Sequence, residues 1–151
     1  MNTILWKPRK NQIKSSQLEA FRLQVNNRFN LNIENYSELH SWSISNISDF
    51  WKAIWGFMAI ESSSNYKQVV DDVNKMPGAK WFEGTRFNFA ENLLRLRSNK
   101  PAIHFQSENK TKKTISYNKL YNEVEKLASS LRKIGVKKGD RIVGYMPNIP
   151  E

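Results

Sequence analysis

The sequence contains no cysteine. This absence excludes a disulfide-stabilised fold, catalysis by a thiol and every metal site built on cysteine. No apolar run approaches the ~18 residues that a membrane-spanning helix needs, and the first ten residues, MNTILWKPRK, lack the apolar core of a secretion signal. We therefore expect a soluble, cytoplasmic protein with no membrane partner.

Familiar motifs of phosphate and metal chemistry are also absent: the sequence has no GxxxxGK[ST], GxGxxG or HExxH. The only histidines, His40 and His104, lie far apart, and a metal site would need them to converge with carboxylates. Asp71 and Asp72 would point to different sides of a helix, so we expect solvated side chains rather than a catalytic pair. The serines at 62–64 have no base nearby in sequence. The residues thus nominate no catalytic, cofactor-binding or metal-binding position.

Positive charge is abundant, with a formal net charge of +10. Basic groups gather in residues 1–28 and 95–119, on either side of a stretch, 30–64, that leans acidic. Such a surface suits a nucleic acid or another anion, or it is simply the solvated surface of a lysine-rich protein. The second interpretation is favoured because no nucleic-acid recognition motif accompanies the charge. We predict no nucleic-acid partner.

The first part of the chain has helical patterns. With 151 residues, 39% of them hydrophobic, the protein can bury ~70% of its unfolded surface. Ser16 and Glu19 form a capping-box pattern, and Phe21, Val25 and Phe29 follow at helical spacing. The serine-rich segment YSELHSWSIS predicts a loop or short connector.

A second helix is predicted in NISDFWKAIWGFMAI, with Asn46 and Asp49 placed to cap its start. Its apolar face consists of Phe50, Trp51, Ile54, Trp55 and Met58. After a polar linker, ESSSN, a further short helix is predicted from Tyr66, Val69, Val70 and Val73, with Pro77 and Gly78 at its end.

The second part has a mixed pattern. Asn88 and Glu91 predict the start of a helix that runs to about Arg97. The segments AIHFQ and KKTISY predict a hairpin, and a long amphipathic helix follows between Ser116 and Gly135. The run DRIVGYM predicts a buried strand. Strand, helix and strand in this order indicate the start of an α/β sheet.

Several segments in the same order resemble the N-terminal part of acyl-CoA synthetases of the adenylate-forming ligase superfamily. The segments WFEGTRFNFAENLL and IGVKKGDRIVGYMPNIPE match the family patterns W-F-x-G-x-x-L-N-x-A-E-N-x-L and G-V-x-x-G-D-R-V-x-x-Y-x-P-N-x-P-E, with Phe87 in place of Leu and Ile142 in place of Val. The segments LWKP, YSELHSWSISNISDFWKAIWGF and MPGAKWFEG are more similar to the acetoacetyl-CoA synthetase branch than to the acetyl-CoA branch, although His40 replaces a tryptophan of that branch.

The resemblance implies an α/β fold in which a helical N-terminal extension, residues 1–97, precedes the truncated beginning (hairpin, helix, strand) of the AMP-binding large domain, residues 98–151. It implies that the complete enzyme is an acetoacetate–CoA ligase that uses ATP, Mg²⁺ and CoA. The family's phosphate loop and catalytic lysine have no counterpart up to Glu151, so no catalytic or cofactor-binding residue carries over and the chain alone is expected to be inactive. A non-catalytic module that docks on a ligase remainder or on another protein is the alternative.

Under this hypothesis the aromatic residues Trp51, Trp55, Trp81 and Phe82 anchor the extension to the large domain rather than form a substrate box. Three arginines, Arg86, Arg95 and Arg97, would approach the CoA phosphates or, as we prefer, occupy solvated or helix-capping positions. The apolar segment Ile142–Met146 would be exposed, so we expect self-association, loose packing or docking on the missing part.

Overall fold

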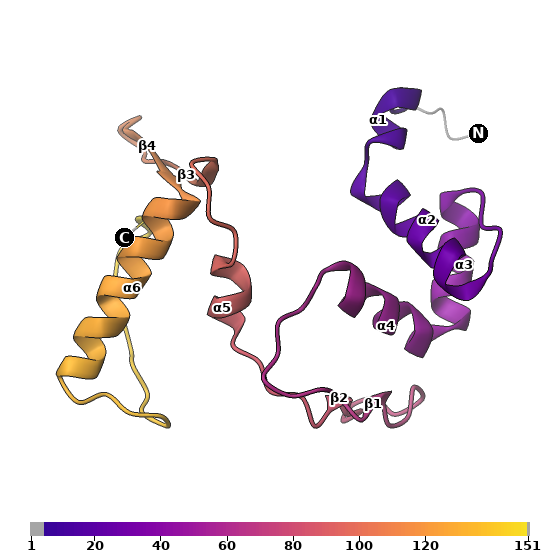
Figure 1. The fold of residues 1–151 in the computed structure, drawn as a ribbon. Helices are drawn as coiled ribbons and strands as arrows, with labels where there is room; N and C mark the ends of the chain where they lie inside the picture. The colour runs from indigo at the N-terminus through magenta and orange to yellow at the C-terminus, as the bar shows by residue number, and fades with distance from the viewer. Residues whose placement is uncertain (1–4, 151) are drawn as a thin grey trace. The chain divides into compact units, whose positions relative to one another are not determined.

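A unit that ends at Phe87 precedes a unit that begins at Asn88 in the computed structural model, which describes residues 5–150 (Figure 1). The first unit contains α1 (Lys10–Lys14), α2 (Gln17–Phe29), α3 (Tyr36–Ser45), α4 (Ile47–Phe57), β1 (Gln68–Val70) and β2 (Trp81–Glu83). The second contains α5 (Phe89–Leu94), β3 (Pro101–Gln106), β4 (Lys112–Ser116) and α6 (Tyr117–Lys133). Within residues 5–150, no helix is both long and apolar enough to cross a membrane.

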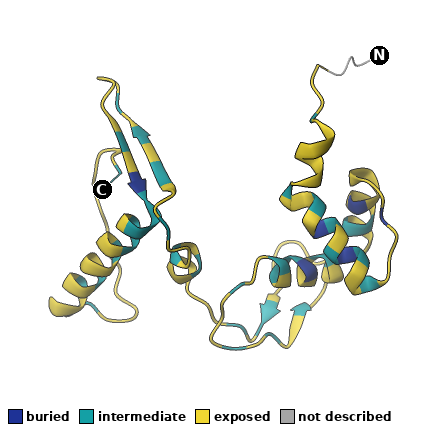
Figure 2. Ribbon diagram, turned by 45° about the horizontal axis from the view of Figure 1, so that its top comes forward, coloured by how far each residue is buried: buried dark blue, intermediate teal, exposed yellow. Residues whose placement is uncertain are grey.

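The core of the first unit lies among α2, α3 and α4, where most of the buried positions gather (Figure 2). The predicted start of α2 is confirmed, because the Ser16 hydroxyl accepts a hydrogen bond from the Glu19 N–H at 3.1 Å. Phe21 and Val25 are buried one turn apart on this helix, and Val25 is fully enclosed. The buried set is Phe21, Val25, Ile33, Leu39 and Ala53.

The expectation of a connector at 36–45 is wrong, since these residues form α3. Asn35 caps the helix by accepting a hydrogen bond from the Glu38 N–H, and the Glu38 carboxylate in return accepts bonds from the Glu34 N–H and the Asn35 side chain. Leu39 is buried, and Trp42 packs against Phe29 with ring centroids 5.2 Å apart. This reciprocal cap and one apolar stripe outweigh the weak helix preference of the serines.

Helix α4 confirms the predicted helix, with two differences of detail. Asn46 occupies the N-cap position, but its side-chain amide donates to the Trp42 carbonyl at the end of α3 and makes no cap bond. The fully buried side chain is the small Ala53, where α4 comes closest to the core, whereas Trp51 and Met58 on the predicted apolar face are exposed.

The chain between α4 and Phe87 is a hairpin, so the predicted short helix at 66–73 is wrong. Strands β1 and β2 pair antiparallel, with Gln68 opposite Glu83 and Val70 opposite Trp81. β-branched valines favour extended backbone, and their pairing partner lies beyond a loop that a local pattern does not cross. Pro77 and Gly78 belong to that loop and do not end a helix.

The predicted hairpin of the second unit is confirmed. Strands β3 and β4 are antiparallel, and the register is irregular between Pro101 and Ile103. Ile115 on β4 is buried. Helix α5 has the predicted Asn88 cap but ends at Leu94, three residues before the predicted end.

Helix α6 begins and ends where the sequence predicts. Ser116 accepts a hydrogen bond from the Lys119 N–H. At the other end Gly135 adopts a φ of 93°, the Gly135 N–H bonds the Arg132 carbonyl, and the Val136 N–H bonds the Leu131 carbonyl. These two bonds form a Schellman motif, which stops a helix best where glycine takes the left-handed residue.

The predicted strand at 140–146 is wrong, because these residues belong to no strand among residues 5–150. A strand needs a neighbour for its backbone groups, and the described part of the chain provides none for this segment. The predicted exposure of its apolar side chains is confirmed: Val143 is 91% exposed and Tyr145 is fully exposed.

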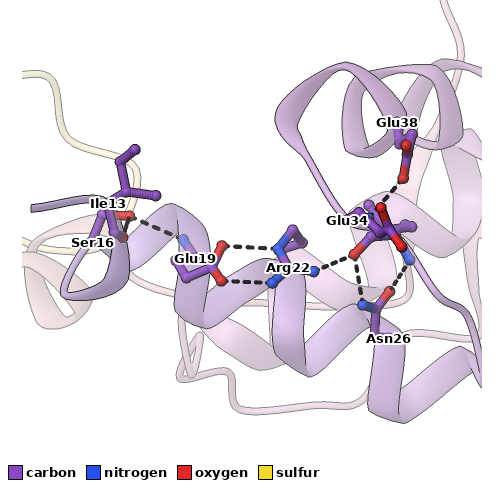
Figure 3. A network of polar contacts seen from close by, with 8 residues as sticks. Ile13, Ser16, Glu19, Arg22, Asn26, Glu34 and Glu38 are labelled. Atoms are coloured by element: carbon purple, nitrogen blue, oxygen red, sulfur yellow. Dashed lines mark hydrogen bonds and ion pairs between the residues drawn. The ribbon is translucent and has the colours of Figure 1, made fainter. Parts of the chain in front are cut away.

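A polar network fastens α2 to the loop that leads into α3 (Figure 3). Arg22 forms a bidentate ion pair with Glu19, with N–O distances of 2.6 and 2.8 Å, and also donates to the Ile33 carbonyl. The Asn26 amide donates to the same carbonyl and accepts a bond from the Ile33 N–H, each at 2.9 Å. Ile33 is thereby held with its side chain in the core.

We expect Asn26→Ala to lower the free energy of unfolding by about 1–3 kcal/mol, because the N–H of the buried Ile33 loses its partner and its carbonyl keeps only the bond from Arg22. Urea unfolding followed by far-UV circular dichroism measures the loss. Asn27→Ala, one exposed position further along α2, is the matched control. An equal loss in both variants would contradict the role assigned to Asn26.

Candidate functional site

The two histidines lie in different units, and each has a local partner. His40 is exposed on α3 and stacks with Tyr36, with ring centroids 6.1 Å apart. The His104 Nδ1 on β3 lies 3.3 Å from the Thr114 hydroxyl on β4. No group of three or more His, Cys, Asp or Glu side chains within residues 5–150 is placed to hold a metal ion.

Asp71 is exposed, as predicted, and it also organises the loop of the first hairpin. Its carboxylate accepts hydrogen bonds from the Lys80 N–H and the Asp72 N–H, both at 2.8 Å, and lies 3.7 Å from the Lys75 ammonium. The bond from Lys80, then those from other backbone amides and the Lys75 charge, lower the pKa of Asp71 against the opposing effect of desolvation. Asp72 accepts a bond from the Asn74 N–H, which forms a second local turn.

The serine segment at 62–64 extends the hairpin and is not a free linker. The Ser63 N–H donates to the Arg86 carbonyl at 2.8 Å, and the Ser64 hydroxyl donates to the Gly84 carbonyl at 2.8 Å. The Arg86 N–H in turn donates to the Ser64 hydroxyl. These hydroxyls replace missing backbone partners at the open end of the hairpin, which explains why serine suits the positions.

Aromatic residues join α4 to the hairpin. The Trp55 ring contacts Tyr66 and Phe82, with centroid distances of 5.5 and 4.4 Å, and also meets Phe87 at 6.2 Å. A second pair, Trp51 and Trp81, meets edge to face at 5.8 Å and remains partly exposed. We call Trp51, Trp55, Tyr66, Trp81, Phe82 and Phe87 the aromatic cluster. Sequence reasoning singled out four of its members as anchors, and the contacts that the structure shows for them lie within the first unit.

Phe82 has an unusual backbone, with a φ of 48°. A large side chain rarely adopts the left-handed region, so the conformation persists only where the surroundings enforce it. The ring of Phe82 packs on Trp55 and Tyr66, and the following Gly84, with a φ of 89°, completes the sharp turn. The aromatic contacts thus hold a strained turn in place.

The three predicted arginines are divided between the two units. Arg86 lies in the first unit and Arg95 and Arg97 in the second. Arg97 lies beyond the end of α5 with its guanidinium carbon 3.2 Å from the centroid of the Tyr121 ring on α6. Such stacking fixes a cation to an aromatic face and leaves its edge open to solvent.

An apolar groove of about 580 Å³ opens beside α2. We call it the α2 groove. It is lined by Pro8, Gln12, Ile13, Ser16, Leu18, Glu19, Arg22, Glu34, Asn35, Tyr36 and Leu39. Sequence reasoning missed this feature, because its walls come from α1, α2 and the start of the unexpected α3.

A second apolar hollow of about 460 Å³ lies in the second unit between β4 and α6. Its lining includes the apolar side chains of Ile115, Leu120 and Val124 and the charged side chains of Lys113, Lys119 and Glu123. The described residues therefore present apolar hollows, and no constellation of nucleophile, base and oxyanion donors.

Comparisons with known proteins find that both units are similar to parts of one kind of enzyme. Residues 36–93 match the family model "Acetyl-coenzyme A synthetase N-terminus", and residues 89–151 match the model "AMP-binding enzyme". Acetoacetyl-CoA synthetase of Macaca fascicularis is 40% identical over 148 residues, and the match covers 96% of this chain and 22% of the relative. Acetoacetyl-coenzyme A synthetase of Rhizobium meliloti is 34% identical, with 97% and 22% covered.

Other kinds of acyl-CoA synthetase also match: malonamoyl-CoA synthetase vrtB of Penicillium aethiopicum is 34% identical over 96% of this chain and 21% of its own length. The solved structure of acetoacetyl-CoA synthetase from Streptomyces lividans superposes with a TM-score of 0.85 at 34% identity, covering 99% of this chain and 24% of that one. The chain thus spans about a fifth of the length of the curated relatives it matches. The predicted resemblance to the N-terminal part of acetoacetyl-CoA synthetases is confirmed.

We expect Trp55→Ala to destabilise the first unit by about 3–5 kcal/mol, because the change removes a large side chain with three aromatic contacts. Trp51→Ala, at a position that is 41% exposed, should cost clearly less. Thermal unfolding followed by near-UV circular dichroism compares the two variants. Equal losses would show that the cluster does not centre on Trp55.

The first hairpin should lose stability in acid. The pKa of Asp71 is lower in the folded chain than its unfolded value of about 3.9, so its contribution is complete above that value and is lost as the pH falls through the lower, folded pKa. The Lys80 amide resonance, followed by NMR against pH, should report the transition. The pH-dependent change of this resonance should be absent in Asp71→Asn. If the change persists in that variant, another group is responsible for it.

Proposed function

We propose that this chain forms the N-terminal part of an acyl-CoA ligase that acts in the cytoplasm on acetoacetate. The complete ligase would take ATP, Mg²⁺ and CoA, form an acyl adenylate with release of pyrophosphate, and transfer the acyl group to the CoA thiol with release of AMP. One observation carries the proposal: the similarity to acetoacetyl-CoA synthetases runs through both units and extends to a solved structure at a TM-score of 0.85.

The choice of acetoacetate over another short acid rests on the relatives. Acetoacetyl-CoA synthetases from animals and from a bacterium match at 34–40% identity, whereas the malonamoyl-CoA synthetase matches at 34%. Homologues that handle a different acid with similar N-terminal sequence indicate that the acid is selected elsewhere in the ligase.

The contribution of this chain is structural. The aromatic cluster keeps the hairpin of the first unit against α4, and the hollow between β4 and α6 offers an apolar face to a further layer. The described residues do not fit a Mg²⁺ site, since they include no cluster of carboxylates placed for one. We therefore assign no step of the reaction to a residue of this chain.

A docking module without any catalytic role is the second candidate. It is supported by the segment at 142–146, where four large apolar or aromatic side chains are more than half exposed. Exposed apolar patches of this kind usually meet another surface. The partner would be the remainder of a ligase or another protein.

The 151-residue chain alone should show no acetoacetate-dependent exchange of pyrophosphate into ATP, because exchange needs groups that bind the phosphates and none is assembled here. A second reaction mixes this chain with the remainder of the Streptomyces lividans enzyme, from which the part that matches this chain has been removed. If exchange occurs only in this mixture, the ligase proposal is supported. Exchange by the chain alone would overturn it, and binding without exchange would favour the docking module.

A further inference from the structure

The segment Leu5–Lys7 directly precedes Pro8, which lines the α2 groove. The side chains of Leu5 and Trp6 are 97% and 73% exposed, which is costly for a leucine and an indole. Two residues after Trp6, Pro8 already forms part of the groove wall. The chain between them spans at most about 7 Å when extended, so Trp6 can reach the groove without any change in α1.

The groove has the size and the lining to receive these two side chains. Its volume of about 580 Å³ falls in the range of ~300–1,000 Å³ that accommodates small organic groups. Three of its apolar walls, Ile13, Leu18 and Tyr36, are themselves 41%, 49% and 64% exposed. A single occupant would remove five large side chains from water at once.

Charge also matches the segment to the groove. Lys7 gives the segment a positive charge, and Arg9 and Lys10 add to it just beyond the segment. Glu19 and Glu34 line the groove, and the basic side chain in its lining, Arg22, is paired with Glu19. Glu34 therefore leaves the lining with a net negative charge, on a chain whose net charge is +10.

We propose that the α2 groove is a docking site for the chain's own segment Leu5–Lys7, which folds back as a strap with the Trp6 indole in the groove and Lys7 beside Glu34. The strap closes the open side of the core formed by α1, α2 and the start of α3. The same segment of a second copy is the less favoured occupant, because the short tether gives the intramolecular arrangement a high effective concentration and two copies repel each other.

Acrylamide quenching of tryptophan fluorescence tests the strap, and the difference between the wild-type chain and Trp6→Phe isolates the signal of Trp6. The Trp6 component should be quenched several-fold less than a free indole. Leu18→Glu places a charge in the groove and should restore free quenching. Leu23→Glu is the matched control, since Leu23 is 54% exposed on the same helix, against 49% for Leu18, but does not line the groove.

Free quenching of Trp6 in the wild-type chain would overturn the proposal, as would equal effects of Leu18→Glu and Leu23→Glu. Protection that falls as the protein is diluted, with a matching change in sedimentation, would assign the groove to a second copy and also overturn it. If Leu18→Glu loses its helical circular dichroism, amide exchange at Trp6 and Lys7 of the wild-type chain decides the question: slow exchange supports the strap and exchange at the random-coil rate refutes it. None of these outcomes depends on ligase activity.

Discussion

The backbone of Ile33 is the point on which the first unit depends. Arg22 and Asn26 occupy its carbonyl and amide from one face of α2, so the loop that follows α2 returns with Ile33 in the core and Asn35 in place to cap α3. Buried backbone groups must be satisfied, and two side chains spaced by four residues do so here. The packing of α3 and α4 on α2 follows from this single fixed turn.

The second unit has no comparable constraint. Its two-stranded sheet is covered on one side by α6, its single buried side chain among the described residues is Ile115, and the segment at 142–146 makes no strand. A two-stranded hairpin is marginally stable by itself, and the apolar hollow between β4 and α6 leaves much of the helix face in contact with water. Among the described residues, the second unit therefore lacks a second layer of structure over its apolar face.

The sequence predicts correctly those features of the fold that depend on interactions between residues close together in the chain. The caps at Ser16, Asn88 and Ser116 and the glycine stop at Gly135 each depend on residues within one turn, and all are present. The pairing of β1 with β2 was missed, because its partner lies beyond a loop and a valine pair alone fits a helix or a strand. Helix α3 was missed because its cap begins before the serine-rich segment. The four predicted aromatic anchors do take part in packing, but their observed contacts lie within the first unit, and their predicted role in holding the extension to the large domain stays a prediction. The α2 groove depends on the packing of three helices and has no signal in the sequence.

Phe82 is subject to two opposing demands. Its left-handed backbone favours glycine or asparagine, while its contacts with Trp55 and Tyr66 require a large ring. Glycine at position 82 would remove the backbone strain of the turn but would also remove the aromatic contacts with Trp55 and Tyr66. Most other residues would neither remove the strain nor keep the contacts. Position 82 therefore has a very narrow mutational tolerance, although it lies on a short hairpin where substitutions are usually absorbed. A residue without a large ring at this position would leave the left-handed turn without the contacts with Trp55 and Tyr66 that enforce it.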